Sequence, residues 1–188
     1  DTIGITIDSG SDITGSAIVK TAVSGGYECT YTPDTALSDG SHTIKIDASD
    51  NDGNAAVQKS VTFKIDTVPP TLSITSPADG LVTNQAACTV TGTTNDTTSS
   101  PVKVTVKLNS GSAESVTVGS DGGFSKVLTL TEGSNTITIV ATDSAGKSTT
   151  VTRTVKLDTS APVIKSVTLT PNPVDAGKTF VISVEITD

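Results

Sequence analysis

Apolar and polar residues alternate along most of this chain with a period of two. The clearest runs place an apolar residue at every second or fourth position: Val102, Val104, Val106 and Leu108 in one, Phe124, Leu128 and Leu130 in the other. Such alternation puts one set of side chains on a buried face of a β-strand and the other set in solvent. The pattern therefore predicts half-buried strands.

The strand pattern repeats after about 92 residues. The segment 42–53 aligns with 135–146 at an offset of 93 residues, and the segment 61–67 aligns with 153–159 at an offset of 92. A repeat of this length is the size of a small domain, so each copy is expected to build its own core.

A short segment containing proline follows each copy, at residues 66–70 and 158–162. Proline fixes φ and lacks the N–H that a strand ladder needs, so strand pairing stops there. We therefore expect domains at 1–66, 67–158 and 159–188.

The complete copy is predicted to contain seven short strands separated by turn residues. Their expected ranges are 71–76, 86–94, 102–109, 113–119, 124–130, 135–142 and 149–158. Short strands at this spacing are typical of an antiparallel β-sandwich, so we predict an all-β fold with one sandwich in each complete unit.

The two ends of the chain hold complementary parts of one unit. Residues 1–66 contain counterparts of only the last five strands, while 163–170 and 178–187 match only the first two. Exposed apolar faces and strand edges are prone to pairing. The chain is then either a window cut from a longer tandem array, which we favour, or a subunit whose copies join head to tail as a filament.

Composition supports strands and excludes some partners. The chain has 188 residues, of which 35 are Thr, a residue that favours strands over helices. Its net charge of −8 opposes binding to nucleic acid or to anionic membranes. Since no apolar run approaches about 18 residues and no signal-peptide pattern opens the chain, we expect no anchor or leader, and the abrupt start resembles a mature fragment.

Four segments resemble the bacterial Ig-like domains that occur in tandem. These segments are 70–80, 89–94, 121–124 and 135–146. Domains of that family resemble the accessory domain of glucodextranase and recur in surface proteins, secreted hydrolases and phage tail proteins. The resemblance implies Ig-like β-sandwiches in a secreted or surface setting. The chain has no Trp, unlike Ig domains of the vertebrate type.

Cysteine and histidine offer little chemistry. Cys29 and Cys88 fall in different units, so a disulfide between them is not expected, and both are predicted to be small buried apolar residues. No cysteine and histidine ligand set for zinc is present. The single histidine, His42, aligns with Asn135 and is predicted to lie on a strand surface, so no catalytic role is expected.

Oxygen ligands gather at Asp47, Asp50 and Asp52, with Asn51 and Asn54 close by. Calcium prefers such ligands, so this cluster is a candidate calcium site. An EF-hand is excluded because the positions that require Gly and Glu hold other residues.

A turn also accounts for part of this cluster. Asp50 and Gly53 stand in the same places as Asp143 and Gly146 of the next copy, as expected for a turn that joins the last two strands. Both interpretations stay open at this point. A second calcium site is hypothesised at the domain junctions, where Asp66 and Asp158 precede the linkers.

The aromatic residues give no sign of a sugar-binding platform. Tyr27, Tyr31, Phe63, Phe124 and Phe180 alternate with other apolar residues, and all five are predicted to lie in cores.

The function expected from these features is a non-catalytic extracellular spacer, part of a longer cell-surface protein or of a fibre or filament. The alternatives are an adhesive or carbohydrate-binding module, accessory domains of a secreted polysaccharide hydrolase, and Ig-like domains of a virion or phage tail. Expected partners are neighbouring Ig-like domains or copies of the chain itself, and a glycan or surface protein in the adhesive case. No cofactor is expected apart from calcium.

Overall fold

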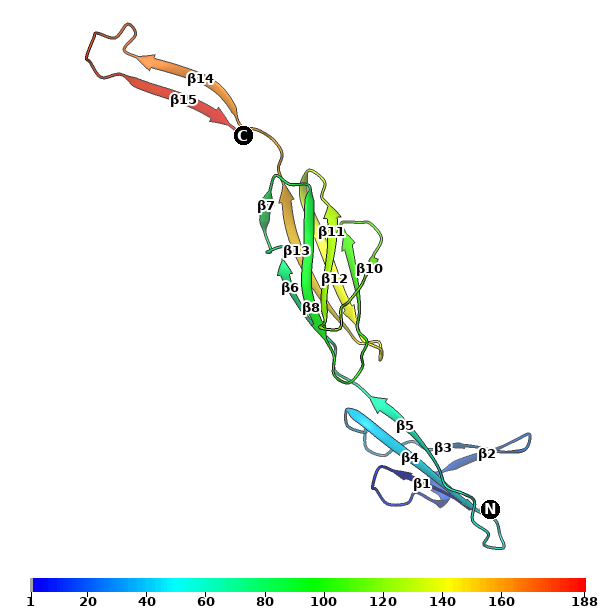
Figure 1. The fold of residues 1–188 in the computed structure, drawn as a ribbon. Helices are drawn as coiled ribbons and strands as arrows, with labels where there is room; N and C mark the ends of the chain where they lie inside the picture. Colours follow the sequence, from blue (N-terminus) through cyan, green and yellow to red (C-terminus); the bar gives the residue numbers. More distant parts are fainter. Residues whose placement is uncertain (1) are drawn as a thin grey trace.

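The computed structural model describes residues 2–188, and almost all regular structure in that range is β-strand. In chain order the elements are β1 (Thr2–Ile7), the 3-10 turn η1 (Gly15–Ala17), β2 (Val19–Val23), β3 (Gly26–Thr30), β4 (Gly40–Ser49), β5 (Lys59–Ile65), β6 (Thr71–Ser76), β7 (Leu81–Thr83), β8 (Ala87–Asn95), β9 (Lys103–Leu108), β10 (Glu114–Val116), β11 (Gly123–Thr129), β12 (Gly133–Thr142), β13 (Ser148–Leu157), β14 (Val163–Thr170) and β15 (Val181–Thr187). Strands β1–β5 make the first unit, β6–β13 the middle unit, and β14–β15 the C-terminal hairpin, and these parts lie end to end (Figure 1).

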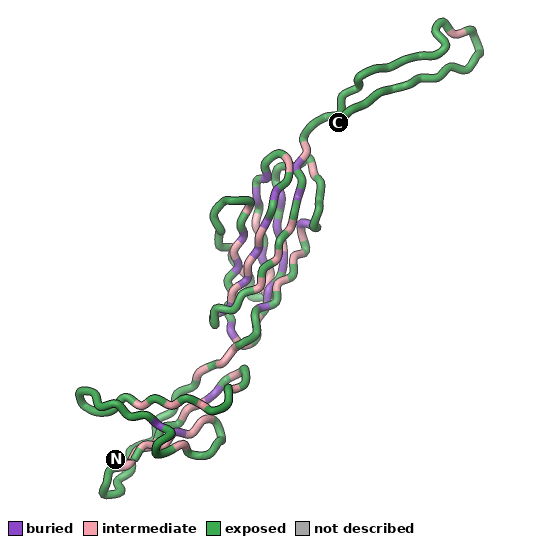
Figure 2. Tube along the Cα trace, turned by 180° about the vertical axis from the view of Figure 1, so that it is seen from behind, coloured by how far each residue is buried: buried purple, intermediate pink, exposed green. Residues whose placement is uncertain are grey.

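The middle unit is a sandwich of two sheets. One sheet has the strand order β10-β9-β12-β13-β7 and the other β11-β8-β6. The side chains that alternate inward fill the space between them, and Val90, Ile137 and Ile139 are fully buried. Figure 2 shows the buried positions concentrated in this unit. The all-β fold predicted from the alternation is thereby confirmed.

The structure adds one strand to the seven that were predicted for the middle unit. Strand β7 has three residues and pairs in parallel with β13. Gly80, which has a φ of 75°, turns the chain into it, and its amide donates to the Thr154 carbonyl at 2.8 Å. A strand of three residues is too short to show alternation, so its sequence gave no signal.

The first unit repeats one layer of this sandwich and leaves that layer open. Its sheet has the order β1-β4-β5, and β2 and β3 form a separate hairpin. Ile46 of β4 stands in the place of Ile139 of β12, yet Ile46 is 43% exposed and Ile139 is 0% exposed. No described strand of this unit is a counterpart of β6 or β8. Strand β3 approaches the same face near Ile3 and Ala48, where Tyr27 lines a hollow with them, and Ile46 stays partly exposed.

The C-terminal hairpin pairs only with itself, and both strands are exposed along their whole length (Figure 2). Two of the five aromatic residues predicted to be buried are therefore exposed: Phe180, which just precedes β15, is 49% exposed and Tyr27 of β3 is 56% exposed. Phe124 is buried as predicted, while Tyr31 and Phe63 are half-buried. The prediction fails at Phe180 because no described layer lies against the hairpin. It fails at Tyr27 because that ring lines an open hollow beside Ile3 and Ala48 and is not enclosed there.

Within residues 2–188, no helix has the length and apolar character needed to cross a lipid bilayer.

Candidate metal centre between the first and middle units

Three aspartates meet where the first unit joins the middle unit. Asp66 follows the last residue of β5, Asp96 follows β8 and Asp143 follows β12. One carboxylate oxygen from each lies within 4.8 Å of the other two. Strands β8 and β12 both end at the end of the sandwich that faces β5 (Figure 1). Three residues far apart in sequence therefore come together there.

Backbone hydrogen bonds orient two of these carboxylates. Asp66 Oδ1 accepts from the Val68 amide at 3.1 Å, and Asp143 Oδ1 accepts from the Lys147 amide at 2.9 Å. The second oxygen of each, Oδ2, is buried and has no hydrogen-bond partner among the described residues. Asp143 is only 5% exposed, and a buried carboxylate oxygen without a partner is costly to desolvate.

The third carboxylate, that of Asp96, accepts hydrogen bonds within the loop that follows β8. Asp96 Oδ1 accepts from the amides of Thr98 and Ser99, both at 2.8 Å. The carbonyl of Ser99 in turn accepts from the Ser144 amide at 3.0 Å, which ties this loop to the turn that carries Asp143. The positions of Asp96 and Asp143 are thus fixed by the turns that follow β8 and β12.

From the first unit, the ammonium of Lys64 donates to the Thr98 carbonyl at 3.1 Å. Its positive charge lies next to the loop of Asp96, and it adds a direct contact between the two units.

This arrangement fits a hard divalent cation. Three carboxylates held together repel one another, and a cation among them removes that cost. Calcium binds six to eight oxygens at about 2.3–2.6 Å, so two of its oxygen ligands lie at most about 5.2 Å apart, and the three carboxylate oxygens are within that limit. The three carboxylates would hold the ion, and carbonyls and water would complete its shell.

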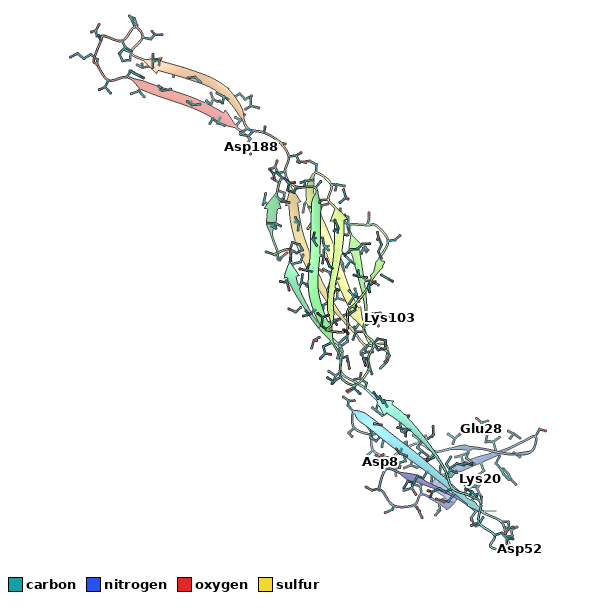
Figure 3. All side chains as sticks on the ribbon, viewed as in Figure 1. Asp8, Lys20, Glu28, Asp52, Lys103 and Asp188 are labelled. Carbon is teal, nitrogen blue, oxygen red and sulfur yellow. The ribbon has the colours of Figure 1, made fainter. Side chains whose placement is uncertain are left out.

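The second junction carries part of the same set. Asp158, the counterpart of Asp66, lies 2.9 Å from the Lys156 ammonium, and its hydrogen bond to Lys156 lowers the pKa of Asp158 and raises that of Lys156. Asp188, at the position of Asp96, lies beside this linker (Figure 3). The junction hypothesis named Asp66 and Asp158, which lie at different junctions, and the acidic neighbours of Asp66 are Asp96 and Asp143.

Asp47, Asp50 and Asp52 are not gathered into a comparable ligand group within the described chain. Asp50 accepts from the amides of Asp52 and Asn54 at 3.0 and 2.8 Å and from the Asn54 side chain at 2.8 Å, and these bonds lower its pKa. Asp47 accepts from the Gln58 side chain. The contacts of Asp50 are those of the turn that joins β4 and β5. Asp52, in the same turn, lies at the end of the first unit away from the middle unit (Figure 3).

His42 was predicted on a strand surface, and that prediction is wrong. The side chain is buried, with Nε2 2.7 Å from the Ser38 carbonyl and Nδ1 2.8 Å from Asp8 Oδ2. The hydrogen bond to the Ser38 carbonyl, followed by the one to Asp8, raises the pKa of His42. Both ring nitrogens are engaged by oxygen atoms, so the residue has a structural role.

The two cysteines are free thiols. Cys88 is buried in the middle unit, which raises the pKa of its thiol, and Cys29 is half-buried on β3.

Two solved structures align with most of the chain. Fibronectin(III)-like modules of Clostridium thermocellum CbhA align with a TM-score of 0.44 and 17% identity, covering 84% of this chain and 77% of theirs. A tetra-tandem repeat from the extending region of a large adhesion protein aligns with a TM-score of 0.41 and 22% identity, covering 98% of this chain and 55% of that one.

The curated relatives are much longer proteins. Bacillopeptidase F of Bacillus subtilis (strain 168) is 32% identical over 128 residues, which are 68% of this chain and 8% of that protein. The PII-type proteinase of Lactococcus lactis subsp. cremoris is 29% identical over 165 residues, 78% of this chain and 9% of the proteinase. The chain therefore spans less than a tenth of the length of either relative.

Two family matches follow the repeat found in the sequence. Residues 1–67 match the family described as bacterial Ig-like domain, and residues 70–159 match glucodextranase, domain B. Together with the sandwich of the middle unit, these matches show that the chain belongs to the tandem bacterial Ig-like domains.

Proposed function

We propose that this chain is a non-catalytic spacer of an extracellular protein, in which calcium holds successive Ig-like units in line. The observation that carries the proposal is the meeting of Asp66, Asp96 and Asp143 across a junction. Asp66 belongs to the strand end of the first unit and the other two to the middle unit, so an ion bound by all three links both units.

The energetics favour an ion over an empty cluster. Without a cation, the buried Asp143 faces two further carboxylates, and their repulsion pushes the linker away from the middle unit. With a cation, the same charges bind the linker to the ends of β8 and β12. Bound calcium would therefore stiffen the junction between the first and middle units.

The proposed location follows from the ligand type and the family. Oxygen-only sites of modest charge in extracellular modules bind calcium at about 10⁻⁴–10⁻³ M, a range that suits a calcium-rich exterior. The chain also matches only small parts of two large proteinases, as expected for a spacer beside other modules.

Isothermal titration calorimetry with Ca²⁺ tests the site. Asp96→Asn keeps the oxygen that accepts from Thr98 and Ser99 and removes one charge, so it is expected to weaken binding at least about tenfold. Asp52→Asn, in the exposed turn of the first unit, is the matched control and should bind like the parent chain. Absence of binding by the parent chain, or equal loss in both variants, would contradict the proposal.

A further inference from the structure

The linker between the first and middle units is held at its first-unit end by Asp39. This aspartate lies in the loop before β4, and its two carboxylate oxygens accept from the amide and from the hydroxyl of Thr67, both at 2.9 Å. The loop itself is fixed, since Nε2 of the buried His42 lies 2.7 Å from the Ser38 carbonyl. Asp39 therefore ties a linker residue to the body of the first unit.

The second linker has the same pair of residues. Glu132, in the loop before β12, accepts from the Thr159 amide at 3.2 Å and from the Thr159 hydroxyl at 2.8 Å. These two residues stand in the places of Asp39 and Thr67 in the next copy of the repeat. Because carboxylates of different length make the same two contacts, this pairing is a recurring feature of the way the chain leaves a unit.

The middle unit holds the other end of the first linker. The Pro70 side chain is buried, and its carbonyl accepts from the Thr149 hydroxyl at 2.6 Å. Only Val68 and Pro69 separate this contact from Thr67. Proline fixes φ at Pro69 and favours extended backbone at the residue before it. The remaining freedom of the linker is therefore concentrated at Val68, which is 58% exposed.

Asp66 lies directly beside the contact with Asp39. The Thr67 amide belongs to the peptide group that joins Asp66 to Thr67, so a hydrogen bond to that amide sets the direction of the Asp66 backbone. One carboxylate oxygen of Asp66 lies within 4.8 Å of those of Asp96 and Asp143. The linker is thus held to the first unit at one residue while the residue before it reaches the middle unit.

We propose that Asp39 is a positioning residue of the calcium site, which holds Asp66 through Thr67 where its carboxylate meets those of Asp96 and Asp143. Both oxygens of Asp39 are engaged by Thr67, so Asp39 acts on the ion through Thr67 and not as a ligand. The inference rests on the calcium site proposed above. It assigns the orientation of Asp66 to a contact that forms before the ion binds, and a ligand set oriented in advance binds more tightly.

Isothermal titration calorimetry of the full chain with Ca²⁺ tests the positioning role. Thr67→Val removes the hydroxyl that donates to Asp39 and leaves the charge of the chain unchanged, so it is expected to weaken binding about three- to tenfold. Thr67→Ser keeps a hydroxyl and should bind like the parent chain. Thr159→Val makes the same change at the second linker, is the matched control, and should also bind like the parent chain.

The outcomes of this titration separate the positioning role from the calcium site. Equal affinity of Thr67→Val and Thr159→Val, with calcium bound by both, would overturn the positioning role and leave the site intact. A parent chain that binds no calcium would overturn the site and the positioning role together.

Distances between the two units test the same contact without relying on affinity. Nitroxide labels at the exposed positions Lys45 and Lys107, in a chain whose native cysteines are replaced by alanine, report them by double electron–electron resonance. In chelator, Thr67→Val is expected to broaden the distribution of distances relative to the parent chain, and saturating calcium should narrow it again. An unchanged distribution in chelator would overturn the proposal.

Discussion

The His42 ring and the Asn135 side chain make the same hydrogen bond in successive Ig-like units. His42 Nε2 lies 2.7 Å from the Ser38 carbonyl, and Asn135 Nδ2 lies 2.7 Å from the Thr131 carbonyl, in both cases four residues earlier in the chain. A carbonyl can only accept, so the nitrogen donates in both units. Each side chain thus fastens the loop that leads into its strand.

In each unit a second residue joins this hydrogen-bonded arrangement, which we call the clasp. Asp8 contacts His42 at 2.8 Å and accepts from the Thr43 amide at 2.8 Å, while Asn109 donates to Asn135 at 3.1 Å and accepts from the Thr136 amide at 2.8 Å. Asp8 and Asn109 also share a positive φ, 55° and 50°. The clasp is therefore ionisable in the first unit and neutral in the middle one.

The first unit should consequently lose stability as the pH rises from about 6 to 8. Hydrogen bonding to the Ser38 carbonyl and to Asp8 raises the pKa of His42 above its ordinary 6.5, so its contribution is fully present below that pH and is lost as the pH rises through the raised pKa. The Thr43 amide and His42 lower the pKa of Asp8 below 3.8, so its contribution is present above that pH and is lost in acid.

His42→Asn removes the imidazole, the group of this network that titrates near neutral pH, and should remove this dependence between pH 6 and 8. Chemical denaturation at several pH values checks the prediction, and the middle unit serves as an internal control. A first unit whose stability rises over that range in the parent chain would contradict the assignment.

Asn135→Ala should destabilise the middle unit by about 2 kcal/mol or more. The side chain is fully buried and bonds to the carbonyls of Thr131 and Gly133, which would be left without a donor. Asn84→Ala, at an exposed position, should change the free energy of unfolding by less than about 0.5 kcal/mol. Urea denaturation measures both values, and equal costs would show that the clasp does not support the fold.

Ile139→Ala and Ile46→Ala form a matched pair that measures how open the first unit is. Ile139 is fully buried, so its truncation should cost about 2–5 kcal/mol, whereas Ile46 is 43% exposed and should cost less than about 1.5 kcal/mol in dilute solution. An equally large cost for both residues in a monomeric chain would show that the first unit is closed.

The fold was largely predictable because its signals are local. Alternation marked the strands of the middle unit, and the 92-residue repeat separated it from its neighbours. The solvent exposure of Tyr27 and Phe180 was not predictable in this way. Alternation identifies the inward face of a strand but does not show whether another layer covers that face.

The convergence of the three aspartates was predictable only in part. Asp66 was a candidate ligand because it precedes a linker that contains proline. Asp96 and Asp143 lie far from it in the sequence, and only the fold brings the three together. One signal was available: Asp143 is the counterpart of Asp50, in the cluster first considered for calcium. Asp50 lies in an exposed turn of the first unit, whereas its counterpart Asp143 is buried beside Asp66 and Asp96.

Small-angle X-ray scattering of the chain, in calcium and in chelator, tests most directly whether an ion at the junction holds the units in line. In calcium we expect the profile of a stiff, extended particle, and in chelator that of flexibly linked units with a shorter average maximum dimension. Asp143→Asn keeps the acceptor for Lys147 and should resemble the chelated state even in calcium. Identical profiles in both conditions, or a compact side-by-side pair in calcium, would contradict the account.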